Sequence, residues 1–184
     1  MAGLNRYNWS VKYSSSREVV AAGIKCVFIS HQKKDQIEAK RIADFLLECD
    51  INVYFDEYDH DLKFPNQFSD PRAVTNCICK GVNNSSHMLV LVSSITLYST
   101  WVPFEIGYGF EKTELATLCL KGIKKSELPE YVRTGKIVRD IYDLNKWIRE
   151  FSPQSKSILE SRSSWNDYSS SLHPLSSIMD TAVT

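Results

Sequence analysis

The sequence predicts an α/β protein in which helices cover both faces of a parallel sheet. Two observations lead to this fold class. Short apolar segments alternate about five times with longer segments of helical spacing across residues 25–151. The apolar segment in the middle, Met88–Ser93, carries no charge and includes β-branched residues, as expected of a strand buried on both faces. We therefore expect a flavodoxin-like three-layer sandwich with a five-stranded parallel sheet.

Each predicted strand is a short apolar run that ends in polar or turn residues. The first run ends abruptly with Ser30 and His31, and the second alternates between apolar and polar positions. The last is the weakest of the five. The expected strands are Lys25–His31, Ile51–Phe55, Met88–Ser93, Leu115–Leu120 and Lys136–Arg139.

The first and last predicted helices are amphipathic. The first begins at Asp35, and Glu38 follows at the distance of a capping box. The last follows the fifth strand and ends at Phe151. Their expected buried residues are Ile37, Ile42, Ala43, Leu46 and Leu47 in the first helix, and Ile141, Leu144, Trp147, Ile148 and Phe151 in the last.

Another helix is predicted between the second and third strands. Asp70 can cap it, Pro71 takes its first position, and Gly81 provides the C-terminal stop. Its expected buried face consists of Val74, Cys77 and Ile78.

Residues 1–24 and 152–184 are expected to be extensions of a domain that spans residues 25–151. The first extension is expected to pack loosely or to contribute to an interface. Eleven of the 33 residues in the second extension are serine, and its apolar residues are sparse and aperiodic. Because such a composition offers little core to offset chain ordering, deletion from Ser152 onward is expected to leave a folded domain. The alternative is that Ile158, Leu159, Trp165 and Tyr168 dock a short helix.

The composition excludes several classes of function. The 22 basic and 22 acidic residues balance, so no overall field favours nucleic acid or an anionic membrane. No apolar run approaches the roughly 20 residues that span a bilayer, and no leader is visible, so a cytoplasmic protein without membrane contact is expected. The five cysteines mostly lie in apolar runs, as reduced core thiols do. The spacing of Cys77 and Cys79 does not match a zinc site, and no metal is expected.

Trp101 and Glu105 form the most informative pair. They lie four residues apart in a predicted helix, so they share one face. Ser99 or Thr100 can cap this helix, and Pro103 falls within its first turn. Glu105 thus follows the carboxyl end of the central strand, where open α/β sheets bind ligands. The simpler interpretation is a solvated glutamate that complements the helix dipole and a tryptophan that packs in the core.

Four segments carry a resemblance to a known family: Val27–His31 with Asp35, Ile51–Phe55 with the long loop after it, Gly81–Ser85 before the central strand, and Ser99–Glu105. In this order and spacing, the chain resembles a TIR (Toll/interleukin-1 receptor) domain over residues 25–151. The resemblance implies the TIR version of the flavodoxin-like fold.

In the enzymatic branch of this family, the glutamate of a W-x-x-x-E arrangement is catalytic, and Glu105 matches that position. The resemblance implies cleavage of the nicotinamide–ribose bond of NAD, which gives nicotinamide and ADP-ribose or a cyclised ADP-ribose. NAD is then the substrate, and no cofactor is required. The family's nucleotide contacts include the loop after the first strand. The expected substrate-binding residues are Ser30, His31, Gln32 and Lys33 in this loop, Asp56 after the second strand, Ser93 at the end of the central strand, and Trp101.

The resemblance also implies partners and a biological context. The chain looks like the bacterial antiphage enzymes of the Thoeris type, whose nucleotide product reaches an effector protein. In related TIR enzymes a neighbouring protomer completes the active site. We therefore expect a homo-oligomer held by TIR–TIR contacts, with Tyr58, Phe64 and Phe68 of the 56–69 loop at the interface.

The chain departs from the family pattern in two places, and one alternative function stays open. Asp50 stands where many members have a turn glycine, and the 56–69 loop is acidic and aromatic with no glycine. The alternative is a non-catalytic adaptor module that acts through TIR–TIR contacts, although an adaptor does not need the Glu105 carboxylate. A phosphoacceptor receiver domain is excluded, because the first and third strands end in Ser30-His31 and Ser93-Ser94 rather than in acidic residues.

Overall fold

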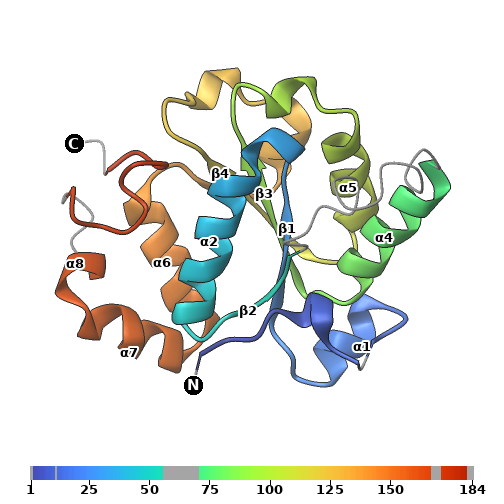
Figure 1. Ribbon diagram of the computed structural model, residues 1–184, viewed down its shortest axis with the longest axis horizontal. Coiled ribbons are helices and arrows are strands. Elements are labelled where there is room, and N and C mark those ends of the chain that lie inside the picture. The colour runs from blue at the N-terminus through green and yellow to red at the C-terminus, as the bar shows by residue number, and fades with distance from the viewer. Residues whose placement is uncertain (1, 11, 56–70, 167–170, 182–184) are drawn as a thin grey trace.

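Five parallel strands form one sheet in the part of the chain that the structure describes (Figure 1). The structure is a computed structural model, and it describes residues 2–10, 12–55, 71–166 and 171–181. The order of the strands in the sheet, β2-β1-β3-β4-β5, confirms the predicted flavodoxin-like arrangement. The strands are β1 (Cys26–Ser30), β2 (Asn52–Tyr54), β3 (His87–Val92), β4 (Glu114–Cys119) and β5 (Lys136–Val138).

Helices cover both faces of the sheet, as buried parallel strands require (Figure 1). One face is covered by α2 (Gln36–Glu48) and α6 (Ile141–Phe151). The other is covered by α4 (Pro71–Asn83) and α5 (Trp101–Gly109), and the short α1 (Ser16–Ala21) lies on that side as well. The predicted three-layer sandwich is therefore confirmed.

The central strand β3 supplies both layers of the core. Because side chains alternate along a strand, Leu89 and Leu91 join the cluster that includes residues of α2 and α6. Met88, Val90 and Val92 join the cluster that includes residues of α5. All five side chains are buried, which confirms the prediction of a strand covered on both faces.

The start of α2 differs from the prediction. A short 3-10 helix, η2 (Lys33–Asp35), precedes α2, and Asp35 makes no capping hydrogen bond. Its buried carboxylate instead accepts hydrogen bonds from the hydroxyls of Ser93 and Thr96, at 2.7 and 3.1 Å. The predicted capping box is therefore wrong, because Asp35 is engaged across the sheet edge by residues that follow β3.

The buried face of α2 is mostly as predicted. Ile42, Ala43 and Leu46 are buried, and Leu47 is partly buried against the same core. Ile37 is 75% exposed, so its assignment to this face is wrong. Ile37 precedes Leu46 by nine residues, which is about two and a half helical turns, so the two side chains point in opposite directions. In α6, all five predicted core residues are buried.

Gly81 lies inside α4, which continues to Asn83, so the prediction that this glycine ends the helix is wrong. A Cβ atom on Gly81 would lie 2.5 Å from Cε2 of Phe28 and 3.1 Å from Cε1 of Tyr54. The glycine is therefore needed for close approach between helix and sheet rather than for termination.

Asp50 makes the turn between α2 and β2 with a φ of +60°. This left-handed region is the one that favours glycine, although aspartate adopts it more readily than most residues do. Asp50 thus makes the turn for which the TIR pattern has glycine in many members.

The N-terminal segment pairs with the sheet, so the expectation that it packs loosely is wrong. The backbone N–H of Val53 in β2 donates to the carbonyl of Leu4 at 3.1 Å, and Asn5 forms a parallel bridge with Val53. The Asn5 side chain also donates to the carbonyl of Phe55 at 2.8 Å. The segment therefore continues the edge of the sheet beyond β2.

The C-terminal segment also contributes to the core, contrary to the expectation that it has little to anchor it. It forms α7 (Pro153–Ser161) and α8 (Ser163–Asn166). The ring of Trp165 lies 4.8 Å from that of Phe45 in α2, measured between centroids. The large side chains that this segment buries in the α2 and α6 cluster are Leu159, Trp165, Leu175, Ile178 and Met179.

Candidate functional site

Glu105 is carried by α5, which follows β3 at the carboxyl edge of the sheet. A short 3-10 helix, η3 (Thr96–Tyr98), leads into α5. The hydroxyl of Ser99 accepts a hydrogen bond of 3.3 Å from the backbone N–H of Val102, whereas Thr100 makes no side-chain cap. Val102 is buried, and Glu105 follows it by three residues on the same side of the helix, so its carboxylate is directed inward.

The Glu105 carboxylate meets the end of β1. The residue is 7% exposed, and its Oε2 accepts a hydrogen bond from the hydroxyl of Ser30. Ser30 is the last residue of β1 and is itself buried. Because β1 and β3 are neighbours in the sheet, this contact joins α5 to the strand beside its own. The structure thus brings together two residues that the sequence assigned to the site.

Burial raises the pKa of Glu105 to about 7, and the hydrogen bond from Ser30 opposes part of that rise. The carboxyl group is therefore close to half-ionised at neutral pH. Carboxyl groups with a raised pKa beside a cavity are found at functional sites, which makes Glu105 a candidate site residue.

Replacing Ser30 with alanine is expected to raise the pKa of Glu105 further, because the hydrogen bond that favours the ionised form is lost. The pH dependence of the Glu105 carboxyl ¹³C chemical shift measures this change. Ser161→Ala, at the end of the remote helix α7, is the matched control and should leave the titration unchanged. An unchanged Glu105 titration in Ser30→Ala would show that the hydrogen bond does not tune this carboxyl group.

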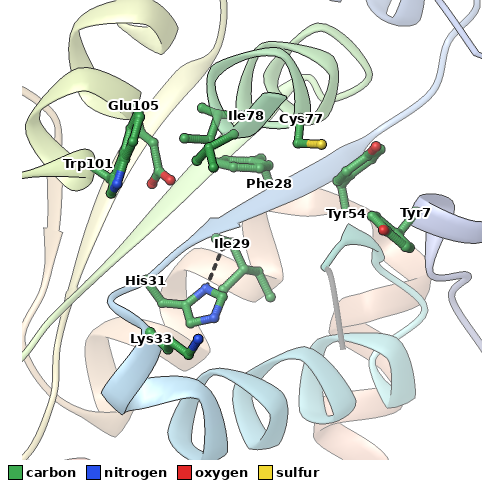
Figure 2. Close-up of a pocket in the computed structure, with 11 residues that line it drawn as sticks. Tyr7, Phe28, Ile29, His31, Lys33, Tyr54, Cys77, Ile78, Trp101 and Glu105 are labelled. Atoms are coloured by element: carbon green, nitrogen blue, oxygen red, sulfur yellow. Dashed lines mark hydrogen bonds between the residues drawn. The ribbon is translucent and has the colours of Figure 1, made fainter. Parts of the chain in front are cut away.

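A cavity with a volume of about 220 Å³ opens beside Glu105 (Figure 2). Trp101 borders it together with Glu105, so the predicted pair does face one space. The Trp101 residue is 37% exposed, which leaves part of its ring accessible. His31 and Lys33, from the loop after β1, also line the cavity. The cavity therefore combines one buried acid with an aromatic ring and two basic side chains.

The predicted buried face of α4 lines this cavity. Val74 and Ile78 are half-buried and Cys77 is exposed, so the prediction of a closed core contact is wrong. The apolar spacing is correct, but the cavity lies between this part of the helix and the sheet (Figure 2).

Two predicted binding residues, Gln32 and Ser93, make hydrogen bonds within the protein instead. The Gln32 side chain caps η2 by accepting a hydrogen bond of 2.6 Å from the N–H of Lys34. The Ser93 hydroxyl donates to Asp35 and accepts hydrogen bonds from two backbone N–H groups of the following turn. Neither residue lines the cavity, and Ser30, whose hydroxyl donates to Glu105, does not line it either. The predicted site and interface residues that lie outside the described residues are Asp56, Tyr58, Phe64 and Phe68.

Three aromatic residues that the sequence did not single out also line the cavity: Tyr7, Phe28 and Tyr54. Phe28 and Tyr54 belong to predicted strands, but a strand covered on both faces does not reveal which face borders a cavity. Tyr7 follows the N-terminal segment that pairs with β2, and no local pattern signals that pairing.

Neither a membrane-spanning helix nor a metal cluster is found among the described residues. No helix there is long and apolar enough to cross a bilayer. No group of three or more His, Cys, Asp or Glu side chains there can hold a metal ion. Burial raises the pKa of Cys26 and Cys49 to about 12 and that of Cys119 to about 11, as expected of core thiols.

The family assignment rests on a match that covers the site. The family model described as TIR domain matches residues 27–155, which is more than half of the chain. This range includes Ser30 and Glu105 but not Tyr7. No curated protein matched the sequence. The match and the strand order β2-β1-β3-β4-β5 lead to one conclusion, that the chain belongs to the TIR-domain family.

Proposed function

We propose that this protein is an NAD-cleaving TIR enzyme that releases nicotinamide together with ADP-ribose or a cyclised ADP-ribose. TIR domains include both NAD-cleaving enzymes and adaptors. The observation that carries the proposal is the buried Glu105 carboxylate, which borders a cavity together with Trp101 at the carboxyl edge of the sheet.

The chemistry of NAD explains why one carboxylate is sufficient. Breaking a glycosidic bond builds positive charge on the ribose, and ordinary glycosidases need a second carboxyl group to protonate the leaving group. The nicotinamide ring of NAD is already cationic at the bond that breaks, and it departs as a neutral molecule. A general acid is therefore unnecessary, and a carboxylate near the anomeric carbon stabilises the developing cation.

The surroundings of Glu105 suit this role. The ionised form of Glu105 is the active one, and a pKa of about 7 leaves this carboxyl group ionised in roughly half of the molecules at neutral pH. A bound cationic nicotinamide ring would favour the ionised form further. Because water is largely excluded, the attraction between carboxylate and ribosyl cation is stronger than in bulk solvent. A preorganised group of this kind is worth about 3–4 kcal/mol, or two to three decades in rate.

The other cavity residues are suited to holding the dinucleotide. The partly exposed ring of Trp101 can stack on nicotinamide or ribose. Lys33 and His31 can meet phosphate and ribose oxygens. NAD is the substrate in this reaction, and no further cofactor is needed.

Self-association is the second part of the proposal. TIR domains commonly interact through TIR–TIR contacts. Aromatic side chains on and around α5 support such contacts here, because Tyr98 is 87% exposed and Phe110 is 51% exposed. We infer a homo-oligomer. The same surface favours the second candidate function, a non-catalytic adaptor that acts through TIR–TIR contacts.

We also infer that the nucleotide product acts as a signal to an effector protein in a cytoplasmic bacterial antiphage system of the Thoeris type. This inference extends the resemblance to the bacterial antiphage TIR enzymes, and it depends on the proposed cleavage, for which the W-x-x-x-E segment that ends at Glu105 is the support. A small polar nucleotide suits this role because it diffuses freely from the enzyme to a second protein.

Incubation of the purified protein with NAD tests the proposal directly. We expect release of nicotinamide, detected by chromatography, and the mass of the second product distinguishes hydrolysis from cyclisation. If the oligomer is the active form, specific activity should fall when the protein is diluted roughly a hundredfold. The absence of nicotinamide at every protein concentration would favour the adaptor function.

A further inference from the structure

We propose that the end of the cavity remote from Glu105, bounded by Tyr7, Phe28 and Tyr54, binds a purine base. Figure 2 shows Tyr7 and Tyr54 at the opposite end from Trp101 and Glu105, with Phe28 between them. This inference rests on the proposed function, since it assigns that end of the cavity to the adenine of the dinucleotide. It also makes the N-terminal segment a part of the site.

The three rings form a preorganised aromatic surface. The centroids of Tyr7 and Tyr54 lie 5.7 Å apart with their planes at 79°, and those of Phe28 and Tyr54 lie 6.3 Å apart. Tyr54 is 5% exposed, and Tyr7 is half-buried. Rings held in fixed positions by separate elements can stack on a planar ligand at little cost in side-chain entropy.

Tyr7 is held in place by specific contacts rather than by apolar packing alone. Its backbone N–H donates to the Asn5 side chain at 3.2 Å, and its carbonyl accepts a hydrogen bond of 2.7 Å from Lys12. Asn5 is itself fixed by its bond to the carbonyl of Phe55. Because the family match begins at residue 27, Tyr7 is a cavity residue that the family pattern does not cover.

This end of the cavity is lined mainly by aromatic rings and suits a planar ligand. Its lining comprises the three rings and Cys77 of α4, whereas Ile78 lies nearer to Glu105 and Lys33 follows β1 (Figure 2). The Lys12 ammonium lies 5.3 Å from the centroid of the Tyr54 ring. Adenine has two flat faces, so it can stack on such rings.

Tyr7→Ala tests the inference by separating the two halves of the dinucleotide. Loss of a stacking ring should weaken binding of adenosine monophosphate roughly tenfold by isothermal titration calorimetry. Nicotinamide mononucleotide, which lacks adenine, should bind as it does to the wild type. In kinetics, KM for NAD should rise about tenfold with little change in kcat, because the lost contact is made equally in ground and transition states.

Control variants exclude a general loss of structure. Tyr131→Ala, at a 39% exposed tyrosine of η5 (Glu130–Thr134), should change neither affinity. Tyr7→Phe should keep most of the adenosine monophosphate affinity. If Tyr7→Ala does not fold, as judged by near-UV circular dichroism, Tyr7→Leu retains apolar bulk without the planar ring and decides the question.

The binding measurements with adenosine monophosphate do not depend on catalysis. Equal binding of adenosine monophosphate by the wild type and the folded Tyr7 variant would overturn the inference, as would a wild type that does not bind it. A wild type that binds adenosine monophosphate through Tyr7 but releases no nicotinamide from NAD would retain the base site and refute the proposed cleavage.

Discussion

Replacement of Glu105 with glutamine is expected to lower kcat/KM for nicotinamide release at least a hundredfold. Glutamine keeps the size and the hydrogen-bonding capacity of the side chain but removes the charge that stabilises the ribosyl cation in the proposed reaction. A preorganised charge of this kind is worth about 3–4 kcal/mol in the transition state. The rate of nicotinamide release at saturating and at low NAD measures the loss in kcat and in kcat/KM separately.

The matched control is Glu111→Gln, at an exposed glutamate just beyond the end of α5, which should keep the wild-type rate. If Glu105→Gln retains more than about a tenth of the activity, Glu105 is not the group that stabilises the cation. The pH profile gives a second readout. The pKa of Glu105 is about 7, so kcat/KM of the wild type should decrease as the pH is lowered below that value and Glu105 becomes protonated.

The stability of the same variant distinguishes lost chemistry from lost structure. The pKa of Glu105 is raised from 4.5 to about 7 in the folded state, so the folded protein holds a proton there that the unfolded chain has released. The free energy of unfolding of the wild type should therefore decrease by about 3 kcal/mol in total as the pH rises from 4.5 to 7. Glu105→Gln should lack this fall and be at least as stable as the wild type at pH 8, as measured by urea denaturation.

The sheet and its covering helices could be predicted because their signals are local. The segment Met88–Ser93 is apolar without interruption, and α6 has apolar residues at helical spacing. Alternation of strands and helices then implies parallel strands with helical crossovers. Each of these steps uses only neighbours in the sequence.

The site could be predicted in part for the same reason. The shared helix face of Trp101 and Glu105 follows from their spacing, and the position of Ser30 follows from the end of β1. The role of Ser93 could not be predicted, because its hydroxyl bonds to Asp35, which precedes it by 58 residues. A polar residue at a strand end can contact either a ligand or another element, and the sequence does not say which.

The contacts of the terminal segments could not be predicted, because the residues they contact are distant in the sequence. Leu4 bonds to Val53 across the edge of the sheet, and Trp165 packs on Phe45. Sparse apolar residues in a serine-rich background leave no periodic signal, although each of them can fill a specific gap between helices. The predicted boundary at residue 152 depended on that missing signal.

Deletion of residues 152–184 is therefore expected to unfold the protein rather than to leave a folded domain. The truncation removes α7 and α8 and uncovers the cluster shared with α2 and α6. Each buried large side chain that is lost costs about 2–5 kcal/mol. Losing Leu159, Trp165, Leu175 and Met179 together approaches the whole stability of a typical domain, about 5–15 kcal/mol.

Near-UV circular dichroism and urea denaturation measure the loss of structure in the truncated chain. A single substitution in the same cluster shows which side chains cause it. Trp165→Ala, which removes the ring that packs on Phe45, should cost about 3–5 kcal/mol and leave a folded but weakened protein. Leu172→Ala, at a side chain that is 77% exposed, should change stability by no more than about 0.5 kcal/mol. A truncated chain with a native near-UV spectrum and a cooperative transition would refute the assignment of these side chains to the core. If the truncated chain unfolds and Trp165→Ala is weakened as expected, the serine-rich segment contributes to the same hydrophobic core as the sheet.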